Sequence, residues 1–218
     1  AIWQLPLLFA GIVSGLLTGR MMSKGVSNRA AGVTGGILTA VGLVLLAVFH
    51  SSTSIVGFLP GAIFGGAGVV MAAVPFGNLI LREAPADYLG PVSSSRTTFG
   101  QFAYTLGFSL STVLIDRLTV GGTTARLEAA GVPANQLSTG IDAVTAYAGQ
   151  GTRPTTALGQ EALTAASSSY GGAFQTTMLL TAAAVLAASG LAWWLLRKGE
   201  GEPKPAHPEG AELEHVPA

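Results

Sequence analysis

The chain contains no cysteine and few charged residues. Of its 218 residues, 10% are Asp, Glu, Lys or Arg, and the 11 basic and 11 acidic side chains cancel at neutral pH. The lack of cysteine excludes disulfides and thiolate-based metal or nucleophilic sites. A net charge of zero gives no indication of nucleic-acid binding. Soluble domains carry about 25% charged residues, so this low charge, with 49% hydrophobic residues, indicates a membrane protein.

Long stretches of the chain carry no charge at all. A bilayer core of about 30 Å needs about 20 apolar residues in a helix, so these stretches predict membrane spans. The expected fold class is therefore all-α, a polytopic membrane helix bundle in contact with lipid. Five spans are predicted, at about 1–19, 30–49, 55–81, 97–115 and 171–196.

Basic residues are concentrated after the first, third and fifth predicted spans. Basic residues in short loops stay on the cytoplasmic side of a membrane. We therefore expect the first span to start on the extracytoplasmic side of the cell membrane and the last to end in the cytoplasm. The residues that support this orientation are Arg20, Lys24, Arg29, Arg82, Arg96, Arg197, Lys198 and Lys204.

The segment before the last span is long, and the end of the chain is polar. Residues 116–170 mix apolar residues with Thr, Ser, Ala and Gly, which predicts an extracytoplasmic loop with short helices. The glycines at 121–122 and the sequence GQGTRP at 149–154 are expected to interrupt these helices. The Pro-, Glu- and Gly-rich tail at 197–218 is expected to be disordered.

Glycines and prolines recur within the predicted spans. Small residues spaced by four let helix backbones approach closely in a membrane, and a proline bends a helix because it removes a hydrogen bond. Such a bent helix either lines or gates a cavity, or is an ordinary kinked helix, and the sequence leaves both possibilities open. The residues expected to act in packing and bending are Gly11, Gly15, Pro60, Gly65, Pro75, Gly77 and Gly107.

The basic loop after the first span follows a pattern. Gly19 and Arg20 precede two methionines, then Ser23 and Lys24, and Arg29 closes the loop. This pattern resembles the cytoplasmic loop between the second and third helices of each half of the major facilitator superfamily, although Ser23 stands where that family usually has an acid. The resemblance implies that Gly19, Arg20, Lys24 and Arg29 form a cytoplasmic gating loop.

The order of elements over nearly the whole chain is similar to the C-terminal part of the fourteen-helix drug:proton antiporters of that superfamily. The Gly- and Pro-rich third span, the sequence GPVSSSRTTFGQFAYTLG at 90–107 and the long segment before the last span carry this similarity. It implies that the spans are helices ten to fourteen and form most of the C-terminal half of a major facilitator fold. The N-terminal half would then belong to a missing part of the same chain or to a separate subunit.

This resemblance implies a proton-coupled secondary transporter that exports small amphipathic compounds or drugs by alternating access. None of the five spans contains Asp or Glu. Because proton coupling usually needs an ionisable group within the membrane, the residue that carries the proton is expected in the missing part of the transporter. Phosphate-loop and zinc-helix motifs are also absent from the sequence. No enzymatic activity, cofactor or metal site is therefore expected.

The first, third and fourth spans would line the central cavity, according to the same resemblance. Their amide, aromatic and methionine side chains are candidates for the substrate path, but interhelical hydrogen bonds or ordinary apolar packing explain each of them as well. A membrane scaffold that binds other transmembrane helices through its glycine stripes is the alternative function. The substrate-path candidates are Gln4, Phe9, Met71, Asn78, Phe99, Gln101 and Tyr104.

Overall fold

The computed structural model describes residues 5–49, 55–151 and 153–196, and within these ranges every regular element is a helix. The all-α fold class predicted from the uncharged runs is therefore confirmed. Gln4 and the tail at 197–218 lie outside the described residues. The elements in chain order are α1 (Leu5–Ser23), α2 (Asn28–Val48), α3 (Ile55–Glu83), the short 3-10 helix η2 (Ala86–Tyr88), α4 (Leu89–Ala129), α5 (Ala134–Gln150) and α6 (Ala157–Leu196).

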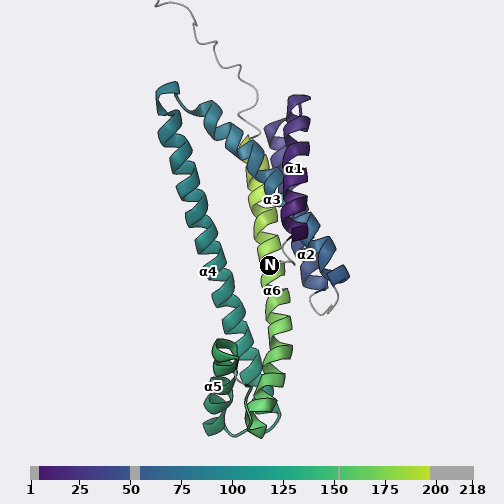
Figure 1. Cartoon of the computed structure of the whole chain (residues 1–218), viewed down its shortest axis with the longest axis vertical. Helices are drawn as coiled ribbons and strands as arrows, with labels where there is room; N and C mark the ends of the chain where they lie inside the picture. The colour runs from purple at the N-terminus through teal and green to yellow at the C-terminus, as the bar shows by residue number, and fades with distance from the viewer. Residues whose placement is uncertain (1–4, 50–54, 152, 197–218) are drawn as a thin grey trace, which may run out of the picture.

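The helices form two groups along the length of α6 (Figure 1). In the first group α3 packs between α1 and α2, and α2 also packs on α6. In the second group the later part of α4 runs beside α6, and α5 packs on both near their far end. The last part of α3 turns away from α1 and α2 and leads to the start of α4 (Figure 1).

The basic segments meet at one end of the molecule. The turn between α1 and α2, the segment between α3 and α4, and the end of α6 all lie at the end opposite α5 (Figure 1). This grouping agrees with the common side that the charge pattern predicts for Arg20, Lys24, Arg29 and Arg96.

Four helices are long and apolar enough to cross a membrane. They occupy Leu5–Ser23, Asn28–Val48, Val56–Leu81 and Ala157–Leu196. The predicted span at 97–115 is helical, but α4 does not belong to this group, because polar residues such as Gln101 and Thr105 lower its hydropathy. By length and composition the described chain therefore has four candidate spans where the sequence predicted five.

The predicted loop at 116–170 is helical along most of its length. The expected interruption at 121–122 is wrong, because α4 continues through both glycines to Ala129. Gly122 is used for packing instead: a Cβ on it would come within 3.1 Å of the Ser169 Cβ in α6. The interruption predicted at 149–154 is confirmed, because α5 ends at Gln150 and Gly151 adopts a left-handed conformation with φ of 72°.

The end of α4 illustrates how local and tertiary interactions combine. Gly131 has a φ of 84°, and the N–H of Val132 donates to the carbonyl of Leu127, 3.0 Å away, as in a Schellman motif. Leu127 is fully buried against Leu137 of α5 and Ala162 of α6. Val132 packs on the same cluster. The turn that ends α4 thus also seals the core shared by α4, α5 and α6.

α4 and α6 are both longer than a bilayer core is thick. With 41 and 40 residues, the two helices are each about 60 Å long at about 1.5 Å per residue. The hydrocarbon core of a bilayer is about 30 Å thick. If α1, α2 and α3 lie in the membrane, the ends of α4 and α6 that contact α5 project beyond it.

Candidate functional site

Glycines bring the backbones of α2 and α3 into direct contact. A Cβ on Gly35 would come within 2.9 Å of the Ala72 Cα, and one on Gly42 within 2.6 Å of the Gly65 Cα. From the other side, a Cβ on Gly68 would come within 2.6 Å of the Thr39 Oγ1. A side chain cannot be accommodated where the obstacle is backbone, so these glycines hold the two helices together.

α1 packs on the opposite side of α3 through a similar contact. Gly66 lies against the backbone of Leu7, and a Cβ on Gly11 would come within 3.0 Å of a methyl group of Val70. The Ser14 hydroxyl donates a 2.7 Å hydrogen bond to the carbonyl of Ala67. Of the packing glycines predicted from the sequence, Gly11, Gly15 and Gly77 lie at tight contacts, whereas Gly65 and Gly107 have open space at the Cβ position.

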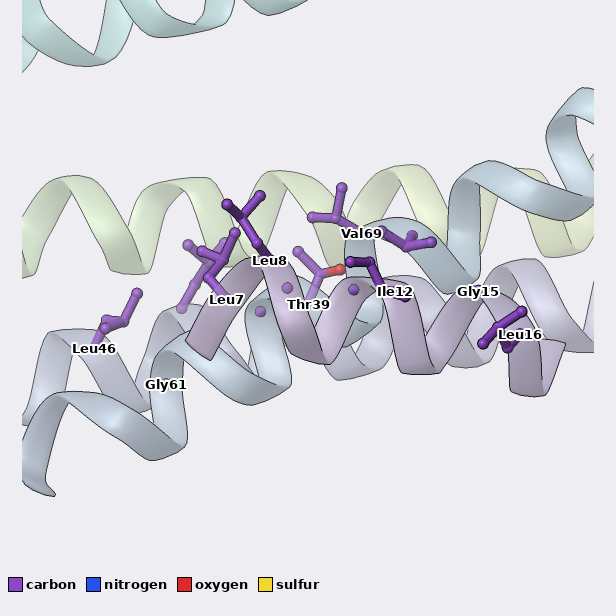
Figure 2. A pocket seen from close by; sticks show the side chains of 14 residues that line it. Leu7, Leu8, Ile12, Gly15, Leu16, Thr39, Leu46, Gly61 and Val69 are labelled. Carbon is purple, nitrogen blue, oxygen red and sulfur yellow. The ribbon is translucent and has the colours of Figure 1, made fainter. Parts of the chain in front are cut away.

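Two apolar hollows flank α1. Figure 2 shows the first, of about 620 Å³, in which Leu8 and Ile12 of α1 lie near Val69 of α3 and Thr39 of α2. The second, of about 520 Å³, contains the predicted candidates Phe9 and Met71. Because neither hollow contains a charged side chain, both suit lipid tails or another apolar helix better than a polar ligand.

A larger cavity of about 840 Å³ lies between α3 and the first half of α4. Phe76 of α3 faces it together with Phe99 and Phe102 of α4, and Arg96 is the charged residue of its lining. Ligand pockets are typically about 300–1,000 Å³, mostly apolar, with a few polar groups. The α3–α4 cavity, defined by Ala73, Phe76, Ile80, Pro91, Val92, Ser95, Arg96, Phe99, Gly100, Phe102 and Ala103, is therefore the candidate functional site.

Helical spacing explains why these side chains share one cavity. On α3, Ala73, Phe76 and Ile80 follow the i, i+3, i+7 pattern of one helix face, and all three line the cavity. On α4, Arg96 and Phe99 follow the same pattern and belong to the opposing face. Phe76, Arg96 and Phe102 were not predicted as site residues. The matching spacing of apolar residues on the two helices could have indicated a shared cavity. It could do so only if α3 and α4 were known to be neighbours.

The predicted substrate-path residues do not gather in one place. Phe99 lines the α3–α4 cavity, whereas Phe9 and Met71 line the hollow beside α1. The Asn78 amide lies 3.9 Å from the Met22 sulfur, a weak acceptor at the end of α1. Gln101 and Tyr104 are exposed on α4 outside the cavity lining, and Tyr104 stacks on Phe108 with centroids 6.5 Å apart.

The predicted gating loop is a tight turn between α1 and α2. Gly25 has a φ of 93°, and the Val26 N–H donates to the Met21 carbonyl, 3.1 Å away. Ser27 then caps α2 by accepting a hydrogen bond from the Ala30 N–H. Arg20 and Lys24 are exposed, whereas Arg29 is partly buried on the first turn of α2. Of the three basic residues, Arg29 is therefore packed against the protein, whereas Arg20 and Lys24 are open to the surroundings.

Arg29 fastens the start of α2 to the end of α6. Its guanidinium carbon lies 3.4 Å from the centroid of the Trp193 ring, which is the geometry of a cation–π interaction. The structure therefore links the basic loop to the last helix, at the end where all the basic segments meet.

Replacing Trp193 with leucine is expected to lower the free energy of unfolding by about 1–2 kcal/mol, because a cation–π contact of this kind is worth about that much when partly desolvated. Trp194→Leu is the matched control, since the neighbouring ring is 61% exposed. Thermal unfolding of both variants in the same detergent measures the difference. Equal destabilisation by the two substitutions would show that the Arg29 contact contributes nothing.

The described residues can be searched for groups that hold a metal or another ligand. No three His, Asp or Glu side chains within the ranges 5–49, 55–151 and 153–196 form a group that can hold a metal. The α3–α4 cavity instead combines aromatic rings with a guanidinium group.

No family model matches the chain, and searches of curated proteins and of solved structures find no similar protein.

Proposed function

We propose that the chain forms one wall of a secondary transporter that exports small amphipathic compounds, driven by a proton gradient, and that the α3–α4 cavity is part of the substrate path. In such transporters the substrate path runs between two halves of the protein. The second half, in the same chain or in a separate subunit, would supply the opposite wall and the proton-carrying residue.

The observation that carries this proposal is the exposure of α4 beside the cavity. Every residue from 93 to 110 is exposed, including Phe99 at 72%, Tyr104 at 71% and Leu110 at 70%. A helix that is exposed on all sides and rich in large apolar side chains needs lipid or further helices around it. The second half of a transporter would cover this part of α4 and close the cavity.

The resemblance of the basic loop and of the order of elements supports the same proposal, and the bent, proline-containing α3 fits a helix that lines a path. The structure places Pro75 fully buried in this helix, directly before Phe76 of the cavity. A proline in a membrane helix is tolerated where neighbouring protein covers the bend.

A scaffold that binds other transmembrane helices is the second candidate. The same exposed stretch of α4 favours it, because an apolar helix without neighbours is also a docking surface for a partner helix. The two functions differ in energy use, since a scaffold needs no proton gradient.

Dye transport in inside-out membrane vesicles from the source organism tests the proposal. We expect vesicles with the wild-type protein to accumulate a fluorescent amphipathic dye when a proton gradient is applied, and to lose the dye when a protonophore collapses the gradient. Replacing both Phe99 and Phe102 with alanine is expected to lower the uptake rate about tenfold or more. Each phenyl ring that contacts the substrate is expected to contribute about 1 kcal/mol or more to binding.

Phe108→Ala is the matched control for this experiment. Phe108 lies on the same helix and is 65% exposed, but it does not line the cavity. Uptake that is the same with and without the gene, or that ignores the gradient, would contradict transport and favour the scaffold.

A further inference from the structure

We propose that the α3–α4 cavity selects amphipathic anions, with the Arg96 guanidinium binding the acidic group and the three phenylalanines holding an apolar, flat body. This inference deepens the proposed function, because it names the substrate class of the same cavity. It is a statement about binding, so it can be tested on the chain without any transport.

The Arg96 side chain reaches from α4 to the backbone of α3. Its guanidinium lies across Gly77, so closely that a Cβ on Gly77 would come within 2.6 Å of the guanidinium carbon. Gly77 directly follows Phe76, whose side chain lines the cavity. Because Gly77 has no side chain, the Arg96 guanidinium can lie against α3 next to Phe76.

The charge of Arg96 is not balanced within the cavity. No Asp or Glu belongs to the lining that the described part of the chain provides, and Arg96 is its one cationic residue. A guanidinium offers a planar set of donors that matches carboxylate, sulfonate and phosphate groups. An anionic group is thus the complementary ligand for this end of the cavity.

The remaining lining selects for the rest of the ligand. Phe76, Phe99 and Phe102 supply aromatic surface from both helices, and the cavity volume of about 840 Å³ accommodates a drug-sized molecule. Aromatic rings add stacking to the gain from burying apolar surface. A compound with one acidic group and one or two rings satisfies both parts of the cavity, and so does an anionic phospholipid, whose phosphate offers the same charge.

The test compares two dyes that share a ring system and differ in charge. The chain is purified into nanodiscs of phosphatidylcholine, and binding of anilinonaphthalene sulfonate and of its uncharged parent, phenylnaphthylamine, is measured by fluorescence titration against empty nanodiscs. Arg96→Gln is expected to weaken sulfonate binding about tenfold, the loss typical of a charge-assisted hydrogen bond. Binding of the uncharged dye is expected to change less than about twofold, which also shows that the variant is folded.

Glycine substitutions test the position of the charge without removing it. Gly77→Ala places a methyl group where the Arg96 guanidinium lies, whereas Gly107→Ala adds one on α4 outside the cavity lining, with no atom within 4 Å. We expect Gly77→Ala to weaken sulfonate binding at least threefold and Gly107→Ala to leave it within about twofold of the wild type, in line with a contact energy of about 1 kcal/mol.

Nanodiscs that contain phosphatidylglycerol identify the source of the anion. If this lipid competes with the sulfonate dye for the wild type and not for Arg96→Gln, the bound anion is a lipid headgroup. If it does not compete, the cavity prefers a free amphipathic anion. The proposal is wrong if Arg96→Gln binds the sulfonate as tightly as the wild type, or if both dyes lose affinity equally. Failure of dye uptake in vesicles, with charge-selective binding intact, would instead contradict the transport proposal alone.

Discussion

Gly42→Leu is expected to separate α2 from α3 and to destabilise the chain by about 3 kcal/mol or more, beyond the usual 1–3 kcal/mol for overpacking. The usual cost reflects side chains that move aside. At Gly42 the obstacles are the Gly65 Cα and the Gly61 carbonyl oxygen, 2.6 and 2.9 Å from the Cβ position. Because these are backbone atoms of a helix, the whole of α3 has to shift.

Gly107→Leu is the matched control for this prediction. It makes the same change in α4, where no atom lies within 4 Å of the Cβ position. Leucine is also the better helix former by up to about 1 kcal/mol, so this control is expected to be neutral or slightly stabilising. Unfolding in detergent, followed by circular dichroism, measures both variants. Equal stability of the two variants would show that the α2–α3 contact does not hold the fold together.

Leu127→Ala is expected to cost about 2–5 kcal/mol, the range for truncating a fully buried leucine. Its side chain has no exposed surface and fills the junction of α4, α5 and α6. The small size of this core, with Leu137 and Ala162 as its other buried members, leaves few groups to close the gap. We therefore expect α5 to detach from α4 and α6 before the rest of the chain unfolds.

Amide hydrogen exchange, followed by mass spectrometry, measures this local loss. Exchange in α5 is expected to rise by a factor of about 30 or more, since every 1.4 kcal/mol is a factor of ten in the opening equilibrium. Leu110→Ala on the same helix is the control, because Leu110 is 70% exposed. Uniform acceleration across α1, α2 and α3 as well would contradict an α5 unit that opens by itself.

Much of the fold follows from local properties of the sequence. Uncharged runs at 1–19, 30–49 and 55–81 predict apolar helices because the apolar character and the length of a span are local features. Gly151 ends α5 because the helix end needs a residue in the left-handed conformation, which glycine adopts without strain. This requirement depends only on neighbouring residues. The grouping of Arg20, Lys24 and Arg96 at one end follows from the alternation of helices alone.

Predictions that required knowledge of neighbours were less successful. The expected interruption at 121–122 fails because Gly122 contacts Ser169 of α6, and a packing glycine cannot be told from a turn glycine within its own segment. The fifth span at 97–115 lacks the hydropathy of the other four. The substrate-path candidates depend on residue type and on the spans that the resemblance places around the cavity, and the structure distributes those it describes among separate surfaces.

By itself, the sequence determined the helices, their apolar character and the basic end of the molecule, since each depends on residues close together in the chain. Only the tertiary structure decided that Arg96 lies on Gly77, that Arg29 meets Trp193, and that Phe76 faces Phe99 and Phe102 across one cavity. These contacts depend on the rotation of one helix against another. Around α3, the glycines that let its backbone touch α1 and α2 set this rotation, and no single segment of the chain contains this information.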